Sequence, residues 1–175
     1  MELTHDTLTS PLGTMLAWHD ADAALVALAF EDRAASVQAW LARQGCNIAD
    51  ARLAPVLTTR RALGSYFEGD LAALDALAVH WSGTAFQRQC WAALQRIAPG
   101  TTLSYAEQAS RIGMTGAARA VGRANAMNPI VVVVPCHRVI GANAALTGYA
   151  GGLERKRWLL AHEARHCGAG QRSAA

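Results

Sequence analysis

The sequence predicts an α+β or α/β protein in two parts, an N-terminal α/β part and a mainly helical C-terminal part with a helix-turn-helix. Two observations support this division, with a boundary near residues 80–85. Short apolar runs alternate with helical segments before this boundary, whereas short helices separated by glycines follow it. Residues 1–80 carry 5 arginines and 10 acidic residues, a net charge of −5, and residues 81–175 carry 11 basic and 3 acidic residues, a net charge of +8. A basic half favours contact with a polyanion such as nucleic acid.

The N-terminal third combines strand and helix patterns. Residues 15–18 and 24–30 alternate or run apolar, which is typical of short strands. Residues 34–43 have helical spacing and end before a glycine, and residues 51–67 predict an amphipathic helix that ends before Gly69. Residues 77–81 predict one more strand. The part is therefore expected to contain a small sheet covered by helices.

The C-terminal part begins with helix signals. Residues 86–97 place apolar side chains on one face, and Pro99 and Gly100 end that helix. Ser104 can cap a helix over residues 105–112, and a second short helix over residues 116–126 follows a glycine turn. Two short helices joined in this way predict a helix-turn-helix.

Two further elements complete the expected fold. The β-branched apolar run at residues 130–134 predicts a buried strand, which Pro135 ends. A last helix is expected over residues 153 to about 164, after a pair of glycines. We expect residues 168–175 to form a disordered tail.

Composition and cysteine spacing exclude several classes of protein. The sequence has no stretch of 18 or more apolar residues, so no membrane span is expected. The N-terminus lacks the pattern of a secretory signal. The four cysteines are irregularly spaced, without a CxxC pair, which disfavours a disulfide framework or a structural zinc site. Free thiols fit a reducing compartment, so the expected location is the cytoplasm.

Cys136 is the strongest candidate for a chemical role, because it follows a predicted buried strand and precedes His137 and Arg138. Cationic neighbours lower the pKa of a thiol, and a base could remove its proton. The alternative is a small buried hydrophobe, which is how most free cysteines behave. Glu163 on the last helix could orient His137, although an exposed helix glutamate is the commoner situation. Cys90 lies on an apolar helix face and is assigned to the core.

From residue 83 to residue 163 the sequence resembles the O6-alkylguanine-DNA alkyltransferases, the methylated-DNA–protein-cysteine methyltransferases. The resemblance rests on ordered motifs, which are Gly83-Thr84-Ala85-Phe86-Gln87, Thr102-Leu103-Ser104-Tyr105, Ala117-Ala118-Arg119-Ala120-Val121-Gly122, Asn128-Pro129, Pro135-Cys136-His137-Arg138-Val139-Ile140 and Gly148-Tyr149-Ala150-Gly151-Gly152-Leu153. Ser10-Pro11-Leu12-Gly13 resembles the family more loosely. The resemblance implies a ribonuclease-H-like support domain at residues 1–82. Residues 83–167 would form the DNA-binding and alkyl-acceptor domain.

The resemblance also implies a reaction. Cys136 would accept the alkyl group of O6-alkylguanine, permanently and once per protein, after the base has been flipped out of the duplex. His137, through a water, and Glu163 would remove the thiol proton. Tyr105 would donate a hydrogen bond to the departing guanine, and Asn128 would brace the turn that holds the cysteine. O4-alkylthymine is a second expected substrate.

Further residues acquire roles from the same resemblance. Arg119 would fill the gap that the flipped base leaves, and small residues on the recognition helix would allow approach to the minor groove. The expected DNA-binding set is Ser104, Tyr105, Ala117, Ala118, Arg119 and Gly122. The expected substrate pocket is Val139, Tyr149, Ala150, Gly151 and Gly152, with carbonyls of Cys136 and Val139 accepting from the guanine amino group. Ala150 stands where some members have serine, so only its backbone N–H could bind the guanine oxygen.

The expected partner is double-stranded DNA that contains O6-alkylguanine, with no cofactor, metal, membrane or obligate protein partner, and the chain is expected to be monomeric. Three other functions remain open. A lesion-binding protein without transfer would lack the cysteine, and a regulator of this family would carry an extra cysteine-rich domain. A thiol hydrolase using Cys136 and His137 would turn over a small ester or amide without DNA.

Overall fold

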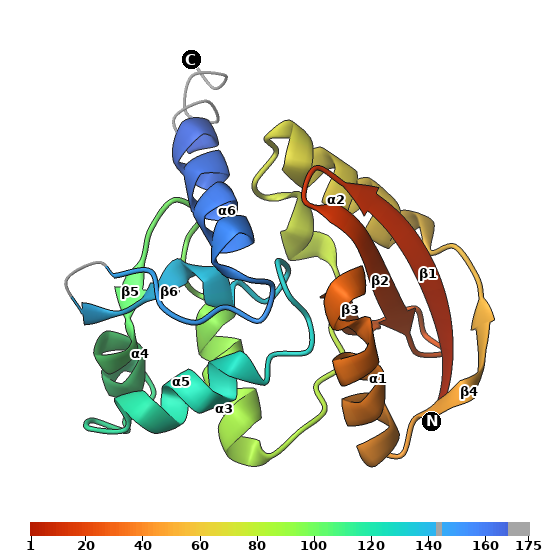
Figure 1. Cartoon of the computed structure of the whole chain (residues 1–175), viewed down its shortest axis with the longest axis horizontal. Coiled ribbons are helices and arrows are strands. Elements are labelled where there is room, and N and C mark those ends of the chain that lie inside the picture. Colours follow the sequence, from red (N-terminus) through yellow and green to blue (C-terminus); the bar gives the residue numbers. More distant parts are fainter. Residues whose placement is uncertain (143–144, 168–175) are drawn as a thin grey trace.

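In the computed structural model, which describes residues 1–142 and 145–167, the N-terminal part is built on one four-stranded sheet. Its strands are β1 (Glu2–Ser10), β2 (Gly13–His19), β3 (Leu25–Phe30) and β4 (Asn47–Leu53), in the order β3-β2-β1-β4. β1 and β3 each pair with β2 in antiparallel fashion, whereas β4 runs parallel to β1 (Figure 1). The sheet is compatible with the ribonuclease-H-like topology that the resemblance implied. The expected tail, residues 168–175, lies outside the described residues.

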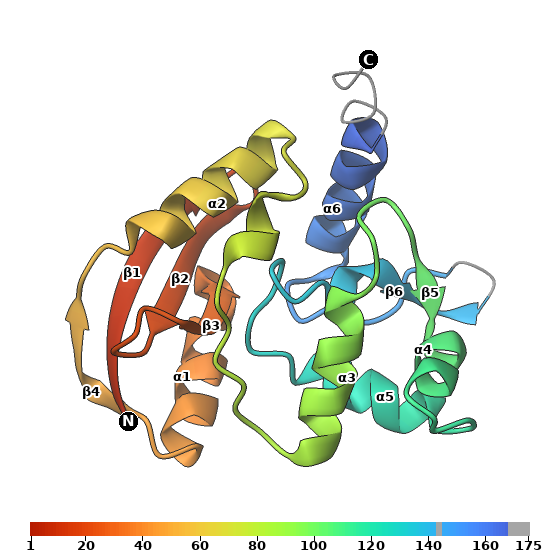
Figure 2. The ribbon, with the colours of Figure 1, turned by 180° about the vertical axis from the view of Figure 1, so that it is seen from behind.

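Two helices cover opposite faces of this sheet, as the two views in Figures 1 and 2 show. α1 (Ala34–Arg43) has the predicted bounds. α2 (Leu57–Glu68) begins later than predicted, because residues 51–53 belong to β4 and the residue before Pro55 is disfavoured in a helix. Gly69 closes α2 with φ +113°, a conformation that glycine adopts without strain.

The outer edge of β3 is where the C-terminal part joins the sheet, and two predicted strands are wrong here. Residues 77–81 and 130–134 each contribute a single bridge to β3, Leu25 with Val79 and Leu28 with Ile130. After its bridge the second segment turns, and Val132 has φ +71°. The apolar run is buried as expected and packs beside the edge of β3. Within the described residues, however, it does not pair with β3 beyond the single bridge.

The C-terminal part consists of short helices and a two-stranded ladder. Its helices are α3 (Ala85–Gln95), α4 (Tyr105–Arg111), α5 (Ala118–Ala126) and α6 (Leu153–His166), and parallel β5 (Leu103–Ser104) and β6 (Val139–Ile140) form the ladder. Thr84 and Ser104 start α3 and α4 with capping boxes, which confirms both predicted helix starts. Short 3₁₀ turns η1 (Glu31–Arg33), η2 (Ala73–Ala76) and η3 (Cys136–Arg138) lie between the larger elements.

α4 and α5 form the predicted helix-turn-helix. Gly113 (φ +74°) and Gly116 (φ +89°) shape the turn between them. A buried amide pair joins the two helices, since Asn125 Nδ2 donates to Gln108 Oε1 at 2.7 Å. Trp91 of α3 donates through Nε1 to the carbonyl of Ala124 at 2.8 Å. These bonds hold α5 at a fixed angle on the surface, as a docking helix requires.

Among the described residues, no helix is long and apolar enough to span a bilayer. Nor do any three histidine, cysteine or acidic side chains in residues 1–142 and 145–167 gather as a metal site would need.

Candidate active site at Cys136

Cys136 begins η3, directly after the turn that follows the β3 bridge. The residue is 5% exposed and lines a cavity of about 230 Å³. The cavity opens between α5, the end of η1 and the segment before α6, and its lining residues are Arg33, Tyr105, Gly122, Asn125, Ala126, Cys136, Gly148, Tyr149 and Ala150. The thiol is therefore buried, yet it borders a space beside the helix-turn-helix.

Asn128 holds the loop that carries the thiol. Its Nδ2 donates to the carbonyl of Val134 at 2.7 Å and to Sγ of Cys136 at 3.2 Å. Its Oδ1 accepts from the backbone N–H of Ile130 at 3.0 Å. One buried amide thus fixes both ends of the turn and touches the sulfur, as the braced loop predicted from the resemblance requires.

The thiol is neutral at rest. Burial raises the pKa of Cys136 to about 11, although the Asn128 hydrogen bond and the Lys156 charge lower it in part. The expectation that His137 and Arg138 act as cations on the sulfur is wrong. Burial lowers the pKa of His137, so the ring is neutral, and Arg138 directs its guanidinium to Glu163 and to the Ile97 carbonyl. Deprotonation of this thiol therefore needs a base.

His137 can supply that base. Its Nε2 lies 2.9 Å from Oε1 of Glu163, and both side chains are fully buried. Burial alone would raise the pKa of Glu163, but hydrogen bonds from His137 and Arg138 and the positive charge of Arg138 hold it well below its usual range. The carboxylate can only accept, so we assign the ring proton to Nε2 and a lone pair to Nδ1. Nδ1 is buried without a hydrogen-bond partner in the described part of the chain.

Glu163 is fully buried and accepts several hydrogen bonds, so the alternative interpretation as a surface glutamate is wrong. Arg138 Nη2 donates to Oε1 at 2.8 Å, and the backbone N–H of Gly100 donates to Oε2 at 3.0 Å. Tyr66 of α2 donates its hydroxyl to Oε1 at 2.8 Å. The carboxylate is thus held by donors from three separate stretches of the chain, one of them in the N-terminal part.

Lys156 is a site residue that the sequence analysis missed. It is fully buried, and its Nζ donates to the carbonyls of Val139 (2.6 Å) and Thr147 (2.8 Å). Its charge lowers the pKa of Cys136. A signal was present, because Lys156, Leu159 and Glu163 are spaced i, i+3 and i+7, which places them on one helix face.

Tyr105 and Gly122 lie together on the cavity wall. An added Cβ at Gly122 would lie 3.6 Å from the Tyr105 ring, an ordinary contact distance. Burial raises the pKa of Tyr105, so its hydroxyl keeps its proton and can donate. Ser104 is half-buried, and its hydroxyl accepts the N–H of Glu107 in the helix cap at 3.1 Å. Tyr105 is thus placed to meet a ligand of the cavity, whereas Ser104 already has a structural role.

Residues 149–152, here called the lid segment, close one side of the cavity. Tyr149 and Ala150 line it, whereas Gly151 packs toward the N-terminal part and Gly152 is the N-cap of α6. An added Cβ at Gly151 would lie 2.5 Å from the Tyr149 ring and 2.7 Å from that of Phe30, so only glycine fits. The Tyr149 hydroxyl is buried without a hydrogen-bond partner in the described residues.

Val139 does not line the cavity as the sequence analysis expected. Its side chain is fully buried, and its carbonyl already accepts from Lys156 Nζ at 2.6 Å. A carbonyl has a second lone pair, so the expected contact with a guanine amino group stays a prediction.

The N-terminal part contributes directly to the site. Arg33 of η1 lines the cavity, a role that no motif indicated. Arg155 of α6 lies 4.1 Å from the Phe30 ring centroid and donates to Asp32 at 2.9 Å and to the Gly151 carbonyl at 3.0 Å. Arg155 therefore fastens the lid segment to the sheet part.

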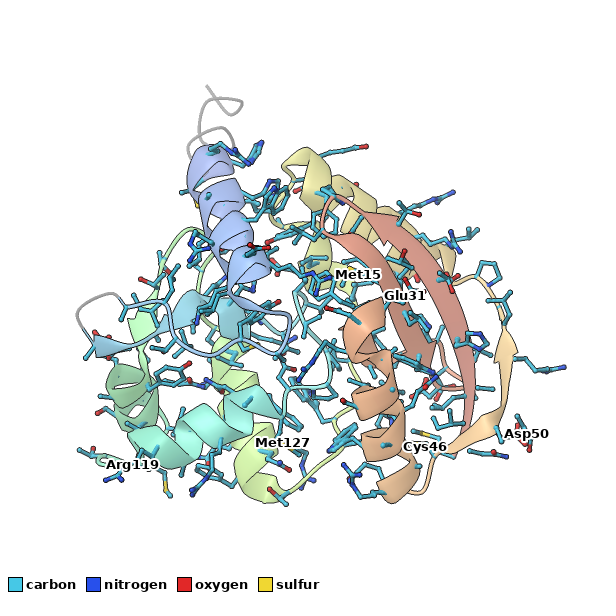
Figure 3. All side chains as sticks on the ribbon, viewed as in Figure 1. Met15, Glu31, Cys46, Asp50, Arg119 and Met127 are labelled. Carbon is cyan, nitrogen blue, oxygen red and sulfur yellow. The ribbon has the colours of Figure 1, made fainter. Side chains whose placement is uncertain are left out.

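α5 presents a basic outer surface. Arg119 and Arg123 are exposed, and Figure 3 shows Arg119 at the end of α5 that lies away from the sheet. Arg119 makes no hydrogen bond or ion pair within residues 1–142 and 145–167. Ala117 and Ala118 are half-buried at the helix start, so little side-chain bulk surrounds the guanidinium. This geometry fits a residue that acts on an external partner.

Comparisons by sequence match the C-terminal part. The family described as 6-O-methylguanine DNA methyltransferase, DNA binding domain, matches residues 85–165. The methylated-DNA–protein-cysteine methyltransferase of Salmonella typhimurium is 56% identical over 101 residues, which cover 58% of this chain and 59% of that protein. The protein of the same description from Mycolicibacterium paratuberculosis is 59% identical over 104 residues, covering 59% of this chain and 62% of that protein. The chain thus matches less than two thirds of the length of these curated relatives.

Solved structures match nearly the whole chain. The structure of Mycobacterium tuberculosis OGT in complex with DNA matches this chain with a TM-score of 0.78 and 35% sequence identity. The match covers 95% of this chain and 94% of the OGT chain. Mycobacterium tuberculosis O6-methylguanine methyltransferase has a TM-score of 0.74 and 35% identity, with 94% of each chain covered. Fold and sequence agree across both parts of the molecule. The chain therefore belongs to the O6-methylguanine-DNA methyltransferases, the family of the methylated-DNA–protein-cysteine methyltransferases.

Proposed function

We propose that this protein repairs DNA by moving the alkyl group of O6-alkylguanine onto Sγ of Cys136, once per molecule. One observation carries the proposal. A neutral thiol lines a cavity beside the helix-turn-helix, and the next residue of the chain carries an imidazole whose Nδ1 is free and whose Nε2 is bound to a buried carboxylate. This arrangement supplies a nucleophile only when a base acts on it, which suits a protein that must react once with a chosen substrate.

The proposed reaction begins at His137. Its Nδ1 takes the thiol proton through a bridging water, and Glu163 stabilises the imidazolium that forms. The Cys136 thiolate attacks the alkyl carbon in line, so a sulfur–carbon bond forms as the carbon–O6 bond breaks. The electron pair leaves with guanine, and the Tyr105 hydroxyl donates to the base as its negative charge develops. The product is a stable thioether, which the proposed chemistry gives no means to cleave.

DNA would dock on the α5 surface. The Arg119 guanidinium would enter the space that a flipped base leaves in the stack, while Ala117, Ala118 and Gly122 would allow α5 to lie close to the minor groove. The basic charge of residues 81–175 supports contact with phosphates. The DNA complex of the Mycobacterium tuberculosis relative, which shares this fold, also supports DNA as the partner.

The scope of the proposal includes several finer points. Residues 1–82 would form a support domain and residues 83–167 the DNA-binding and acceptor domain. The backbone N–H of Ala150 would bind the guanine oxygen, and O4-alkylthymine would be a second substrate. We further propose a monomer that acts in the cytoplasm without a cofactor, which fits the four free cysteines.

An intact-mass measurement tests the proposal directly. The protein is mixed with a duplex that contains one O6-methylguanine, and peptide mapping locates any added CH₂ mass. We expect one such addition per protein, on the Cys136 peptide, and none in Cys136→Ala, which should still bind DNA. Tight lesion binding without mass gain would indicate a recognition protein and overturn the proposal.

The thiol hydrolase remains the second candidate, because Cys136, His137 and Glu163 also suit acyl transfer. It predicts repeated turnover of a small thioester or ester in the absence of DNA. Our proposal predicts no turnover of such compounds, and loss of alkyl acceptance after one equivalent of lesion. Multiple turnovers by the wild type, absent in Cys136→Ala, would favour the hydrolase.

A further inference from the structure

Tyr66 is a further residue of the active site that no motif indicated. It lies in α2, in the N-terminal part, and the whole residue is buried. Its hydroxyl donates to Oε1 of Glu163 at 2.8 Å, the same oxygen that lies 2.9 Å from His137 Nε2. Its backbone carbonyl also accepts from His162 Nε2 of α6 at 2.7 Å. Two bonds therefore fix Tyr66 against the helix that carries the carboxylate.

Oε1 of Glu163 serves more donors than it has lone pairs. Tyr66, His137 and Arg138 Nη2 all lie within 2.9 Å of this one oxygen. A carboxylate oxygen has about two lone-pair sites, so its donors share a limited accepting capacity. Each added donor weakens the attraction of the carboxylate for the His137 proton and for the positive charge of an imidazolium.

We propose that Tyr66 is a positioning residue for the Cys136–His137–Glu163 group and limits the basicity of His137. The inference rests on the proposed function, because it assigns the His137 imidazole as the base for the Cys136 thiol. With the Tyr66 bond present, His137 stays neutral to lower pH and keeps the lone pair that accepts the thiol proton. Without that bond Glu163 would bind the imidazolium more tightly, so His137 would be protonated over a wider pH range.

The other charged and titratable groups around His137 and Glu163 do not change in this comparison. They come from η3, the lid segment and α6, and they are Cys136, Arg138, Tyr149 and Lys156. Burial raises the pKa of Tyr66 well above its usual value, and the Glu163 charge adds to that effect. The phenol therefore remains a donor at any pH at which the protein is assayed.

The test is the pH dependence of single-turnover alkyl transfer in Tyr66→Phe, which removes only the hydroxyl. We expect the acidic limb of the rate profile to move up by about one pH unit, the typical size of an environmental pKa shift. The rate should then fall about tenfold on the acidic limb and return to within about threefold of wild type on the alkaline plateau. An unmoved limb, or an equal loss at every pH, would overturn the inference.

Phe67→Leu is the matched control. Phe67 neighbours Tyr66 on α2 and packs on Trp158 and His162 of α6, but it has no hydrogen-bonding group to direct at Glu163. The substitution loosens the same interface between α2 and α6, so any loss of transfer rate should be the same at all pH values. A limb shift in Phe67→Leu equal to that of Tyr66→Phe would show that packing, and not the hydroxyl, sets the basicity of His137.

Two further measurements separate this inference from the proposed function. Incorporation of 3,5-difluorotyrosine at position 66 makes the phenol a stronger donor without removing it, and should move the limb downward. An NMR titration of the His137 imidazole should give a higher pKa in Tyr66→Phe, whether or not alkyl transfer occurs. If the wild type transfers no alkyl group, the proposed function fails while the titration still decides the role of Tyr66; an unchanged titration overturns that role.

Discussion

His137→Gln gives the sharpest prediction about the reaction. A thiol with a pKa of about 11 is ionised to about one part in 10⁴ at pH 7, which corresponds to about 5 kcal/mol of deprotonation free energy. In the proposed mechanism His137 accepts this proton inside the site, where Glu163 and the new thiolate stabilise the imidazolium, and glutamine cannot accept it although its amide can still donate to Glu163. General-base catalysis contributes about 10²- to 10⁴-fold to a rate, so we expect the transfer rate at pH 7 to fall by an amount in that range.

The pH profile of the variant distinguishes a lost base from a damaged fold. Without a base the reacting fraction is the thiolate at equilibrium, so the rate of His137→Gln should rise about tenfold per pH unit between about pH 7 and 9. Wild type should be nearly flat there. The assay is single-turnover transfer from an O6-methylguanine duplex, with binding affinity measured in parallel and His80→Gln as a control on the partly exposed histidine that pairs with Asp20. A variant rate that is flat with pH, or reduced less than tenfold, would refute the assignment of His137 as the base.

Three further predictions concern other parts of the site. Arg119→Ala should slow transfer from duplex DNA far more than transfer from the free alkylated base, because it leaves base flipping unassisted; equal slowing in kinetic assays would contradict a role in the DNA stack. Glu163→Gln should lower the free energy of unfolding by about 3 kcal/mol at pH 7 in urea titrations, because Arg138 stays buried without its counter-charge. Since the pKa of Glu163 is depressed in the folded state, its stabilisation is present above about pH 4 and lost as the pH falls through the folded value, so the variant should be less acid-sensitive than wild type. Gly151→Ala should displace the Tyr149 ring and slow alkyl transfer. DNA binding through Arg119, measured by fluorescence anisotropy, should stay within about twofold of wild type. An unchanged transfer rate would show that the lid segment accommodates a methyl group.

The sequence predicted most helices of this protein because their signals are local. Apolar spacing and capping residues such as Thr84 and Ser104 act within a few residues, and the helices they predicted are present. β1 was not predicted, because polar residues interrupt any apolar alternation along it and the buried Asp6 forms an ion pair with Arg60 of α2. Such a strand is defined by its partners across the sheet, which a local pattern does not reveal.

The wrong strand at residues 130–134 has a related cause. A β-branched apolar run indicates burial, and every residue of the run is indeed buried. Burial does not require a ladder, however, and here Ile130 makes one bridge to Leu28 before the chain turns at Val132. The pattern identified the environment correctly, whereas the backbone path depended on the edge of β3, which lies far away in the sequence.

The active site shows the same division between local and distant information. Motifs indicated Cys136, His137 and Asn128 together because one short stretch of the chain carries all three, and the contacts of Asn128 stay within that stretch. Glu163 was found as a candidate, but its burial and its ion pair with Arg138 arise from the packing of α6 on η3. The electrostatic state of the thiol was therefore predicted with the wrong sign, since burial was not visible in the sequence.

The N-terminal part is more than a support for the DNA-binding part. Tyr66 reaches Glu163, Arg33 lines the cavity, and Asp32 accepts from Arg155, whose guanidinium also holds the lid segment. The contacts of Tyr66 with Glu163 and of Asp32 with Arg155 join residues more than ninety positions apart, so neither could be read from a local motif. Because the proposed general base, the cavity wall and the lid segment each depend on a residue before position 82, we expect the reactivity of Cys136 to be a property of both parts packed together. A C-terminal part that folded alone would retain the cysteine and α5, but it would lack the contacts that we propose set the basicity of His137 and the position of the lid segment.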